Sequence, residues 1–259
     1  MFNSLWIAKT GMEAQQRQLD TISNNLANSS TNGFKRSSVV FEDLMYQNLR
    51  TAGSPSSEQT NLPTGLQVGL GARAVATSRN YTQGNLVQGR PLDVAINGNG
   101  FFQVSMPDGT TQYTRDGALE ISATGALVTS NGLPLADGIV IPPNASDLSI
   151  ADDGTVTAKL PGQTVAQTIG NITLATFINP AGLEAKGQNL FAETAASGTP
   201  STGAPSANGT GKLMQGYLES SNVNVVQELV TMIQTQRAYE MNSKAIQTSD
   251  QMLQKLGQL

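Results

Sequence analysis

The sequence predicts an α+β protein in which a long helix at each end of the chain flanks a β-rich middle. All 11 prolines lie within residues 55–205, and 23 of the 26 glycines lie within residues 53–216. Because both residues destabilise helix interiors, long helices are permitted only at the two ends. Asn-Gly and Asp-Gly pairs that separate short runs of strand-forming residues predict antiparallel hairpins between them.

The first helix has Asn3 or Ser4 as its possible cap and stops in the turn-forming run at residues 28–33. The last helix can start after Asn224, with Gln227 three residues on as a capping-box partner. At 1.5 Å per residue this helix would be roughly 45 Å long, which is more than a compact domain of this size normally needs.

Each terminal helix carries one narrow apolar line at heptad spacing, without a consistently apolar second position. Such helices bury little surface and are marginal alone, so we expect them to pair as a coiled-coil-like inner domain. An ordinary terminal helix packed on a globular core is the alternative. The lines consist of Leu5, Met12, Leu19 and Leu26 in the first helix and of Val225, Met232, Tyr239, Ile246 and Leu253 in the last.

We therefore expect four parts along the chain: a helix within residues 1–33, an extended linker over 34–69, a β-rich domain over 70–221, and a helix within 222–259. Two Gly-, Ser- and Pro-rich runs inside this frame, residues 51–65 and 197–211, are typical of linkers or exposed loops.

Composition excludes much catalytic chemistry. The chain has no histidine and no cysteine, which excludes Ser-His-Asp and Cys-His catalysis, His- or Cys-ligated metals and disulfides. The formal net charge is −4 and no basic run occurs, which argues against nucleic acid or an anionic membrane as a partner. No apolar stretch reaches the roughly 18 residues of a membrane span, and the first residues lack the pattern of a secretory signal.

Two short motifs suggest ligands, and their contexts argue against both. Residues 69–74 (GLGARA) fit a dinucleotide pattern, but no convincing strand precedes them, and Gly84 and Gly89 interrupt the helix that should follow. Residues 152–154 (DDG) could begin a calcium loop, but no distal carboxylate follows, so a β-turn is the better interpretation. We expect no catalytic site, no cofactor and no metal.

Residues at both ends and in the centre resemble the bacterial flagellar rod and hook protein family. The motifs are residues 24–36 (NNLANSSTNGFKR), 93–102 (DVAINGNGFF), 113–117 (YTRDG), 221–225 (SNVNV) and 236–244 (QRAYEMNSK). The first motif contains the residues that we take as the family signature, which are Asn24, Asn25, Asn28, Asn32, Gly33 and Phe34. Within the family, residues 41–46 and 56–63 resemble members that build the distal part of the rod.

The resemblance implies a structural role and not an enzymatic one. Many copies would stack helically into a stiff, hollow drive shaft that crosses the periplasm and transmits motor torque to the hook. It also implies export through the flagellar type III apparatus, without a cleaved signal peptide. The implied partners are further copies of the chain, the proximal rod proteins, the hook protein and the bushing proteins of the P and L rings.

Three mechanistic expectations follow. Neighbouring copies should cover the apolar lines, so that the helices order fully only on assembly. The rod-specific stretch at residues 46–65, including Tyr46, Pro55, Leu62 and Pro63, should brace neighbouring subunits, with a disordered surface loop as the alternative. Several glutamines off the apolar line could line the central channel, namely Gln234, Gln247, Gln251, Gln254 and Gln258.

Overall fold

The computed structural model of the chain describes residues 2–53, 55–57, 60–61, 63–145, 147–161, 165–207 and 209–257. It divides into two compact units, which are described separately below. The helical unit comprises Met1–Leu26, Ser37–Ser78 and Asn224–Leu259, and the β unit comprises Ala27–Arg36 and Arg79–Val223.

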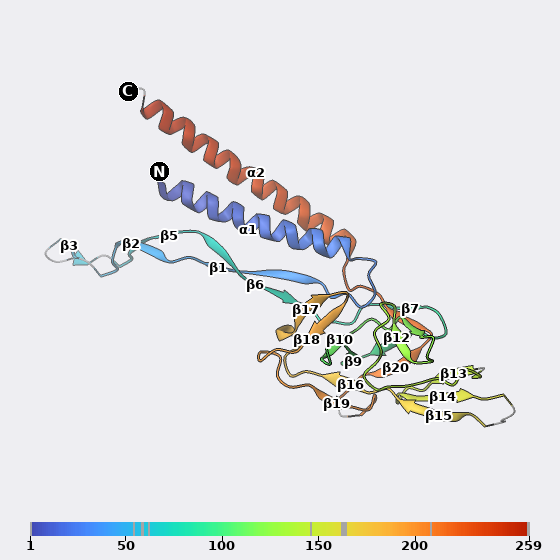
Figure 1. Cartoon of the computed structure of the whole chain (residues 1–259). Helices are drawn as coiled ribbons and strands as arrows, with labels where there is room; N and C mark the ends of the chain where they lie inside the picture. The colour runs from blue at the N-terminus through green and yellow to red at the C-terminus, as the bar shows by residue number, and fades with distance from the viewer. Residues whose placement is uncertain are drawn as a thin grey trace. The chain divides into compact units, whose positions relative to one another are not determined.

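Two long helices run antiparallel in the helical unit (Figure 1). Helix α1 spans Phe2–Ala27 and helix α2 spans Val225–Leu256. Asn242 Nδ2 donates to Gln15 Oε1 over 3.2 Å, and the absence of a side chain at Gly11 makes room for this amide, because a Cβ there would lie 3.0 Å from Asn242 Nδ2. Neither helix, within the ranges given above, is long and apolar enough to cross a lipid bilayer.

Asn224 caps helix α2 as the sequence predicts. Its backbone is extended, and its side-chain oxygen accepts a hydrogen bond from Gln227 N over 3.2 Å. This contact satisfies one of the backbone N–H groups that a helix start leaves without a partner. Glu228 in the first turn and Lys255 in the last complement the helix dipole.

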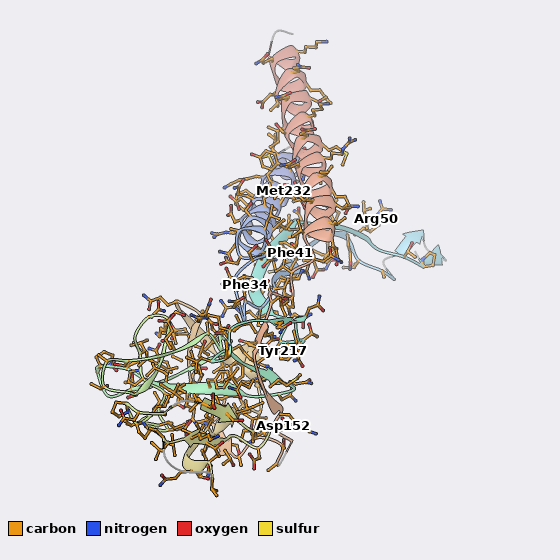
Figure 2. The ribbon with its side chains drawn as sticks, turned by 90° about the vertical axis from the view of Figure 1, so that its right-hand side faces the viewer. Phe34, Phe41, Arg50, Asp152, Tyr217 and Met232 are labelled. Atoms are coloured by element: carbon orange, nitrogen blue, oxygen red, sulfur yellow. The ribbon has the colours of Figure 1, made fainter. Side chains whose placement is uncertain are left out.

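A ribbon of paired strands runs along α1 within the helical unit (Figures 1 and 2). Asn3 Nδ2 donates to Gln47 Oε1 over 3.1 Å, which ties the two elements together. In Figure 2, Phe41 and Arg50 mark successive positions along the ribbon. Its pairs are β1 (Ser37–Asp43) with β6 (Ala72–Arg79), β2 (Tyr46–Arg50) with β5 (Leu66–Gly69), and β3 (Pro55–Ser57) with β4 (Thr60–Asn61).

A six-stranded antiparallel sheet forms the centre of the β unit. In spatial order its strands are β17 (Glu184–Gly187), β18 (Leu190–Ala192), β10 (Thr111–Thr114), β9 (Phe101–Ser105), β16 (Leu174–Thr176) and β19 (Ser201–Gly203).

Smaller sheets and one 3₁₀ turn complete this unit. They are β13 (Asp147–Ile150), β14 (Thr155–Lys159) and β15 (Gln167–Asn171); β11 (Leu119–Ile121) with β12 (Leu127–Thr129); β7 (Leu86–Gln88) with β21 (Tyr217–Glu219); β8 (Val94–Asn97) with β20 (Lys212–Gln215); and the turn Pro180–Gly182.

Strand β9 separates two apolar clusters because its side chains alternate between the faces of the sheet. Phe102 and Val104 are fully buried in the larger cluster, which also contains Ile96 and Leu174. Phe101 points to the other face and joins a cluster of aromatic rings. Burial of each large side chain stabilises the fold by roughly 1.5–3 kcal/mol, so these alternating residues provide much of the core.

Turn chemistry places the hairpins where the sequence predicts them. Gly109 and Gly125 have φ angles of 81° and 82° and connect β9 to β10 and β11 to β12. Gly154 has a φ of 87° and ends the turn between β13 and β14, which agrees with a β-turn at residues 152–154. Side chains disfavour this left-handed backbone, so glycine is the favoured residue at each site.

The element bounds differ from the expected segments in four respects. Helix α1 ends at Ala27, and residues 27–36 belong to the β unit. The expected linker over 34–69 contains most of the strand ribbon. The prediction of a loop at residues 197–211 is wrong for β19, because Ser201–Gly203 pairs with β16 in the main sheet. The run at residues 51–65 contains the short β3–β4 hairpin.

Candidate assembly surface and the family motifs

Polar side chains, and not the predicted apolar line, occupy the most buried positions of α2. Glu228 is fully buried and Thr235 is 5% exposed. Glu228 Oε2 accepts a hydrogen bond from Asn25 Nδ2 of α1 over 3.3 Å. Hydrogen bonds offset the cost of burying these groups, so the facing sides of the two helices are held partly by specific polar contacts.

Apolar side chains gather instead on the exposed side of α2, at its N-terminal end. The exposed fractions are 71% for Val226, 42% for Leu229, 49% for Val230 and 52% for Ile233, and these four residues are called the outer patch. Their spacing of three, four and seven places them on one face of the helix. An amphipathic helix normally turns this face inward, so the outer patch marks a surface suited to contact with another chain.

The nine residues of the predicted apolar lines are more exposed than Glu228 and Thr235 and less exposed than the outer patch. Val225 and Tyr239 are exposed, at 40% and 37%. The other seven, Leu5, Met12, Leu19, Leu26, Met232, Ile246 and Leu253, are half-buried. Figure 2 marks Met232 on α2. Each therefore has surface to cover, and their role in packing against neighbouring copies stays a prediction.

The exposed side of α2 changes character along its length. Gln247 and Gln251 stand five helical turns after Leu229 and Ile233, on the same side, and both are exposed. Gln234 and Gln254 are exposed as well, and Gln258 lies outside the described residues. The apolar surface at the start of the helix thus gives way to a polar one that includes exposed Glu240 and Lys244 as well as the glutamines, and the channel-lining role stays a prediction.

The ribbon of the helical unit also exposes large apolar side chains. Met45 is 82% exposed, Tyr46 54%, Leu49 59% and Leu66 56%. Of the residues predicted to brace neighbours, Pro55 starts β3, Pro63 is exposed, and Leu62 lies outside the described residues. A two-stranded ribbon with exposed apolar residues is marginal by itself in water, so a covering partner would stabilise it.

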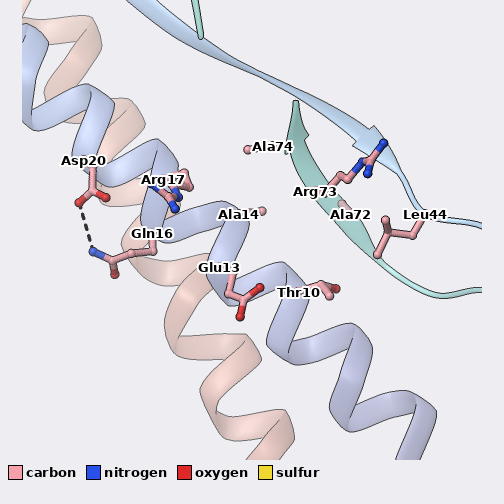
Figure 3. A pocket seen from close by; sticks show the side chains of 10 residues that line it. All are labelled: Thr10, Glu13, Ala14, Gln16, Arg17, Asp20, Leu44, Ala72, Arg73 and Ala74. Atoms are coloured by element: carbon pink, nitrogen blue, oxygen red, sulfur yellow. Dashed lines mark hydrogen bonds between the residues drawn. The ribbon is translucent and has the colours of Figure 1, made fainter. Parts of the chain in front are cut away.

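Figure 3 shows a groove between α1 and the ribbon, with a volume of about 590 Å³. Its lining mixes charges of both signs, including Glu13, Arg17, Asp20 and Arg73. The GLGARA motif ends here, with residues 72–74 in strand β6 and not in the helix that a dinucleotide site needs. In the described part of the chain, no group of three or more acidic side chains could hold a metal ion.

In the helical unit, Asn25 is the signature residue with the clearest role. It is 1% exposed, its Nδ2 donates to Ser37 O over 2.8 Å, and its Oδ1 accepts from Ser37 N over 2.9 Å. The side chain thus mimics a strand partner at the start of β1. Asn24 is exposed and lies on α1 one residue earlier. Only an amide can both donate and accept in this way, which explains asparagine at position 25.

The remaining signature residues lie in the β unit. Asn28 O accepts from Thr31 N over 3.2 Å and closes the turn after α1. Asn32 O accepts from Asn189 Nδ2 over 3.2 Å, and Phe34 O accepts from Asn222 N over 3.4 Å. Gly33 has a φ of 68°, and a Cβ there would lie 2.8 Å from the carbonyl carbon of Arg115, so glycine is required.

A buried cluster of charges that the sequence analysis missed lies beside these residues. Lys35 Nζ lies 2.6 Å from Glu219 Oε1, and an Arg115 guanidinium nitrogen lies 3.2 Å from Glu219 Oε2. All three side chains are at least 97% buried. Burial lowers the pKa of Lys35 and that of Arg115, while contact with Glu219 opposes the change in both. Nothing in a single sequence links residues so distant along the chain.

Known protein families match the three parts of the chain that contain these motifs. The match to the flagella basal body rod protein family covers residues 5–35, and the match to the D1 domain of flagellar hook protein FlgE/F/G covers residues 95–158. The C-terminal family of flagellar basal body rod FlgEFG proteins matches residues 214–259.

Relatives align over nearly the whole chain. The flagellar basal-body rod protein FlgG of Buchnera aphidicola subsp. Acyrthosiphon pisum is 58% identical over 260 residues, covering 100% of both chains. FlgG of Caulobacter vibrioides is 49% identical, covering 99% of this chain and 98% of its own. FlgG of Bacillus subtilis is 40% identical with the same coverage. The chain belongs to the FlgG family of flagellar basal-body rod proteins.

As a member of the FlgG family, this chain is a structural protein of the flagellar basal body. The three matched segments meet at the buried charge cluster: Lys35, Arg115 and Glu219 come from one segment each. Segments matched separately along the FlgG sequence thus form one site in the β unit.

Proposed function

We propose that many copies of this chain assemble helically into the distal rod, a stiff hollow shaft that transmits motor torque to the hook. The outer patch on α2 carries the proposal, because a helix start with four exposed apolar residues is best stabilised by contact with a second copy. Membership of the FlgG family supports the same role.

The finer features of the proposal concern partners and location. The rod would span the periplasm, contact proximal rod proteins, the hook protein and the P- and L-ring bushing proteins, and receive its subunits through the flagellar type III export apparatus without signal cleavage. Exposed Gln247, Gln251 and Gln254 would face the channel, where neutral amides let exported chains pass. The ribbon would brace adjacent subunits through Tyr46 and Leu49.

Substitution of Val226 tests assembly separately from folding. Val226→Asp places a carboxylate in the outer patch, near the start of α2, where negative charge favours the helix dipole. The monomer should keep its melting temperature. Burial of the new charge between copies costs several kcal/mol, so the critical concentration for polymerisation should rise at least about 100-fold.

Val140→Asp is the matched control, because Val140 is 54% exposed in the β unit. Sedimentation of purified protein and electron microscopy of basal bodies would measure assembly. Loss of rods with V226D but not with V140D is expected. Wild-type-like assembly of V226D would contradict the proposal that α2 forms the interface.

A further inference from the structure

Residues 31–36 form a strap that crosses the β unit, with a turn at residues 31–33 and no regular secondary structure over residues 34–36. Gly33 N donates to Glu219 O over 2.8 Å. Arg36 N donates to Asn222 Oδ1 over 2.7 Å, and Arg36 O accepts from Asn80 N over 2.9 Å. The strap thus binds both the C-terminal segment of the β unit and the segment around residue 80.

Lys35 places a charge from the strap into the interior. Lys35 is 2% exposed, and its Nζ donates to Glu219 Oε1 over 2.6 Å and to Thr82 O over 2.9 Å. Glu219 Oε1 also accepts from Gly84 N over 2.9 Å, and Oε2 from Arg115. The Glu219 carboxylate, at the end of β21, therefore joins the strap, the loop at residues 82–84 and Arg115, which directly follows β10.

We propose that the strap is a closing element of the β unit and that Lys35 and Glu219 are its latch, so that the strap, the loop at residues 82–84 and the segment at residues 219–222 open and close as one cooperative unit. The β unit would then be complete only when segments from both ends of the chain are in place. This inference does not depend on the role of the chain in the rod.

The coupling has a physical reason: removal of the strap would leave its buried partners without their contacts. If the strap leaves, Glu219 loses its closest cation in a buried site, and Gly33, Arg36 and Asn222 lose their hydrogen-bond partners together. A buried charge without its partner is strongly unfavourable. Water must then enter around Glu219, which weakens its contact with Gly84 N as well.

Hydrogen exchange in the unaltered full-length protein tests this coupling. The amides of Gly33, Arg36, Gly84 and Asn222 each donate one of the hydrogen bonds above. One opening event predicts that their protection factors agree within about fivefold, and that mild denaturant lowers them together. A spread beyond that range would overturn the proposal if Gly33, Arg36 and Asn222, whose hydrogen bonds involve the strap, exchange faster than Gly84.

Lys35→Met gives a second test, with Lys186→Met as its control. Lys186 forms an exposed ion pair with Glu184 over 2.8 Å, so its loss should leave exchange in the β unit unchanged. K35M should raise exchange at Gly84, whose acceptor Glu219 Oε1 lies outside the strap, by at least about tenfold. Faster exchange in the strap alone, or none, would refute the latch. If K35M fails to fold, the exchange of the unaltered protein decides.

Discussion

Gly71 approaches α1 so closely at Thr10 that a Cβ on Gly71 would lie 2.0 Å from the Thr10 hydroxyl oxygen. Gly71 also has a φ of 117°, which side chains rarely adopt. Thr10 is 7% exposed, and its hydroxyl donates to Ile7 O over 3.0 Å. The strand ribbon and α1 thus meet at a point with no space for a methyl group.

Gly71→Ala should lower the free energy of unfolding by about 3 kcal/mol, because the steric clash with Thr10 and the strain of a left-handed backbone both contribute. Chemical denaturation followed by circular dichroism would measure the change. Gly53→Ala is the control, because Gly53 has a φ of 79° but no atom within 4 Å of its Cβ position. It should cost about 1 kcal/mol, from backbone strain alone. Equal losses in both variants would show that the close approach does not matter.

Ile246→Asp should block assembly while the β unit remains folded. Ile246 is a half-buried member of the apolar line on α2, and burying its replacement carboxylate against a neighbour costs several kcal/mol. Sedimentation would measure assembly, and hydrogen exchange of the β unit would measure folding. Thr248→Asp adds the same charge at a nearby exposed position of α2 that has no proposed role, and is the control. Wild-type-like rods from I246D would exclude the line from the interface.

Deletion of residues 46–65 should give a more flexible or curved polymer. The deletion removes β2, β3 and β4, together with exposed Tyr46 and Leu49. Without their apolar surface, adjacent copies would lose contacts that resist bending. Persistence length, measured from electron micrographs of the polymers, is the readout. Polymers as straight as those of the full chain would support the alternative of a surface loop without a bracing role.

Alkaline pH should weaken the β unit through Tyr113. Burial raises the pKa of the Tyr113 phenol to about 12, and the Glu193 carboxylate, 3.3 Å away, acts in the same direction. A tyrosine in the unfolded chain titrates near pH 10. The raised pKa therefore contributes stability that is fully present below about pH 10 and is lost as the pH rises through about 12.

Tyr113→Phe should flatten the pH dependence of the free energy of unfolding over this range, because it removes the titrating hydroxyl. The substitution keeps the aromatic ring, whose centroid lies 4.8 Å from that of Phe177. Urea denaturation at several pH values would measure the effect. Tyr217→Phe, at an exposed site, serves as control. A Y113F profile as steep as that of the unaltered protein would assign the alkaline loss to other groups.

Local chemistry explains what the sequence predicted correctly. Proline and glycine placement limited long helices to the ends, and the Asn224 cap needs only residues within one turn. The turn at Gly109 likewise depends on two adjacent residues. A single sequence is enough to predict such caps and turns, because the interacting groups are neighbours along the chain.

Side-chain composition did not reveal backbone pairing. Residues 197–211 are polar and glycine-rich, yet Ser197 is 1% exposed and its hydroxyl donates to Thr194 O over 2.9 Å. Strand β19 then pairs with β16 through main-chain groups that every residue carries. Composition alone therefore favoured a loop where the chain completes a sheet.

The heptad line does not coincide with the most buried positions of α2 in the single chain, and its role in assembly stays a prediction. A heptad pattern is built from apolar residues alone. The most buried positions of α2 are instead the polar residues Glu228 and Thr235, whose side chains form hydrogen bonds. The buried pair of Lys35 and Glu219 was hidden for a related reason, since its members lie 184 residues apart. Recognising either arrangement requires knowing which segments meet in space.

Strand pairing in the β unit has a consequence for the rate of folding. Strand β8 pairs with β20, and β7 pairs with β21. The first strands after the ribbon therefore cannot pair until the last strands before α2 are in place. High contact order of this kind goes with folding times of milliseconds to seconds rather than microseconds, because a long loop must close before the pairing is gained. If subunits reach the rod through the export apparatus as proposed, such slow folding would keep the chain unfolded until it has left the channel.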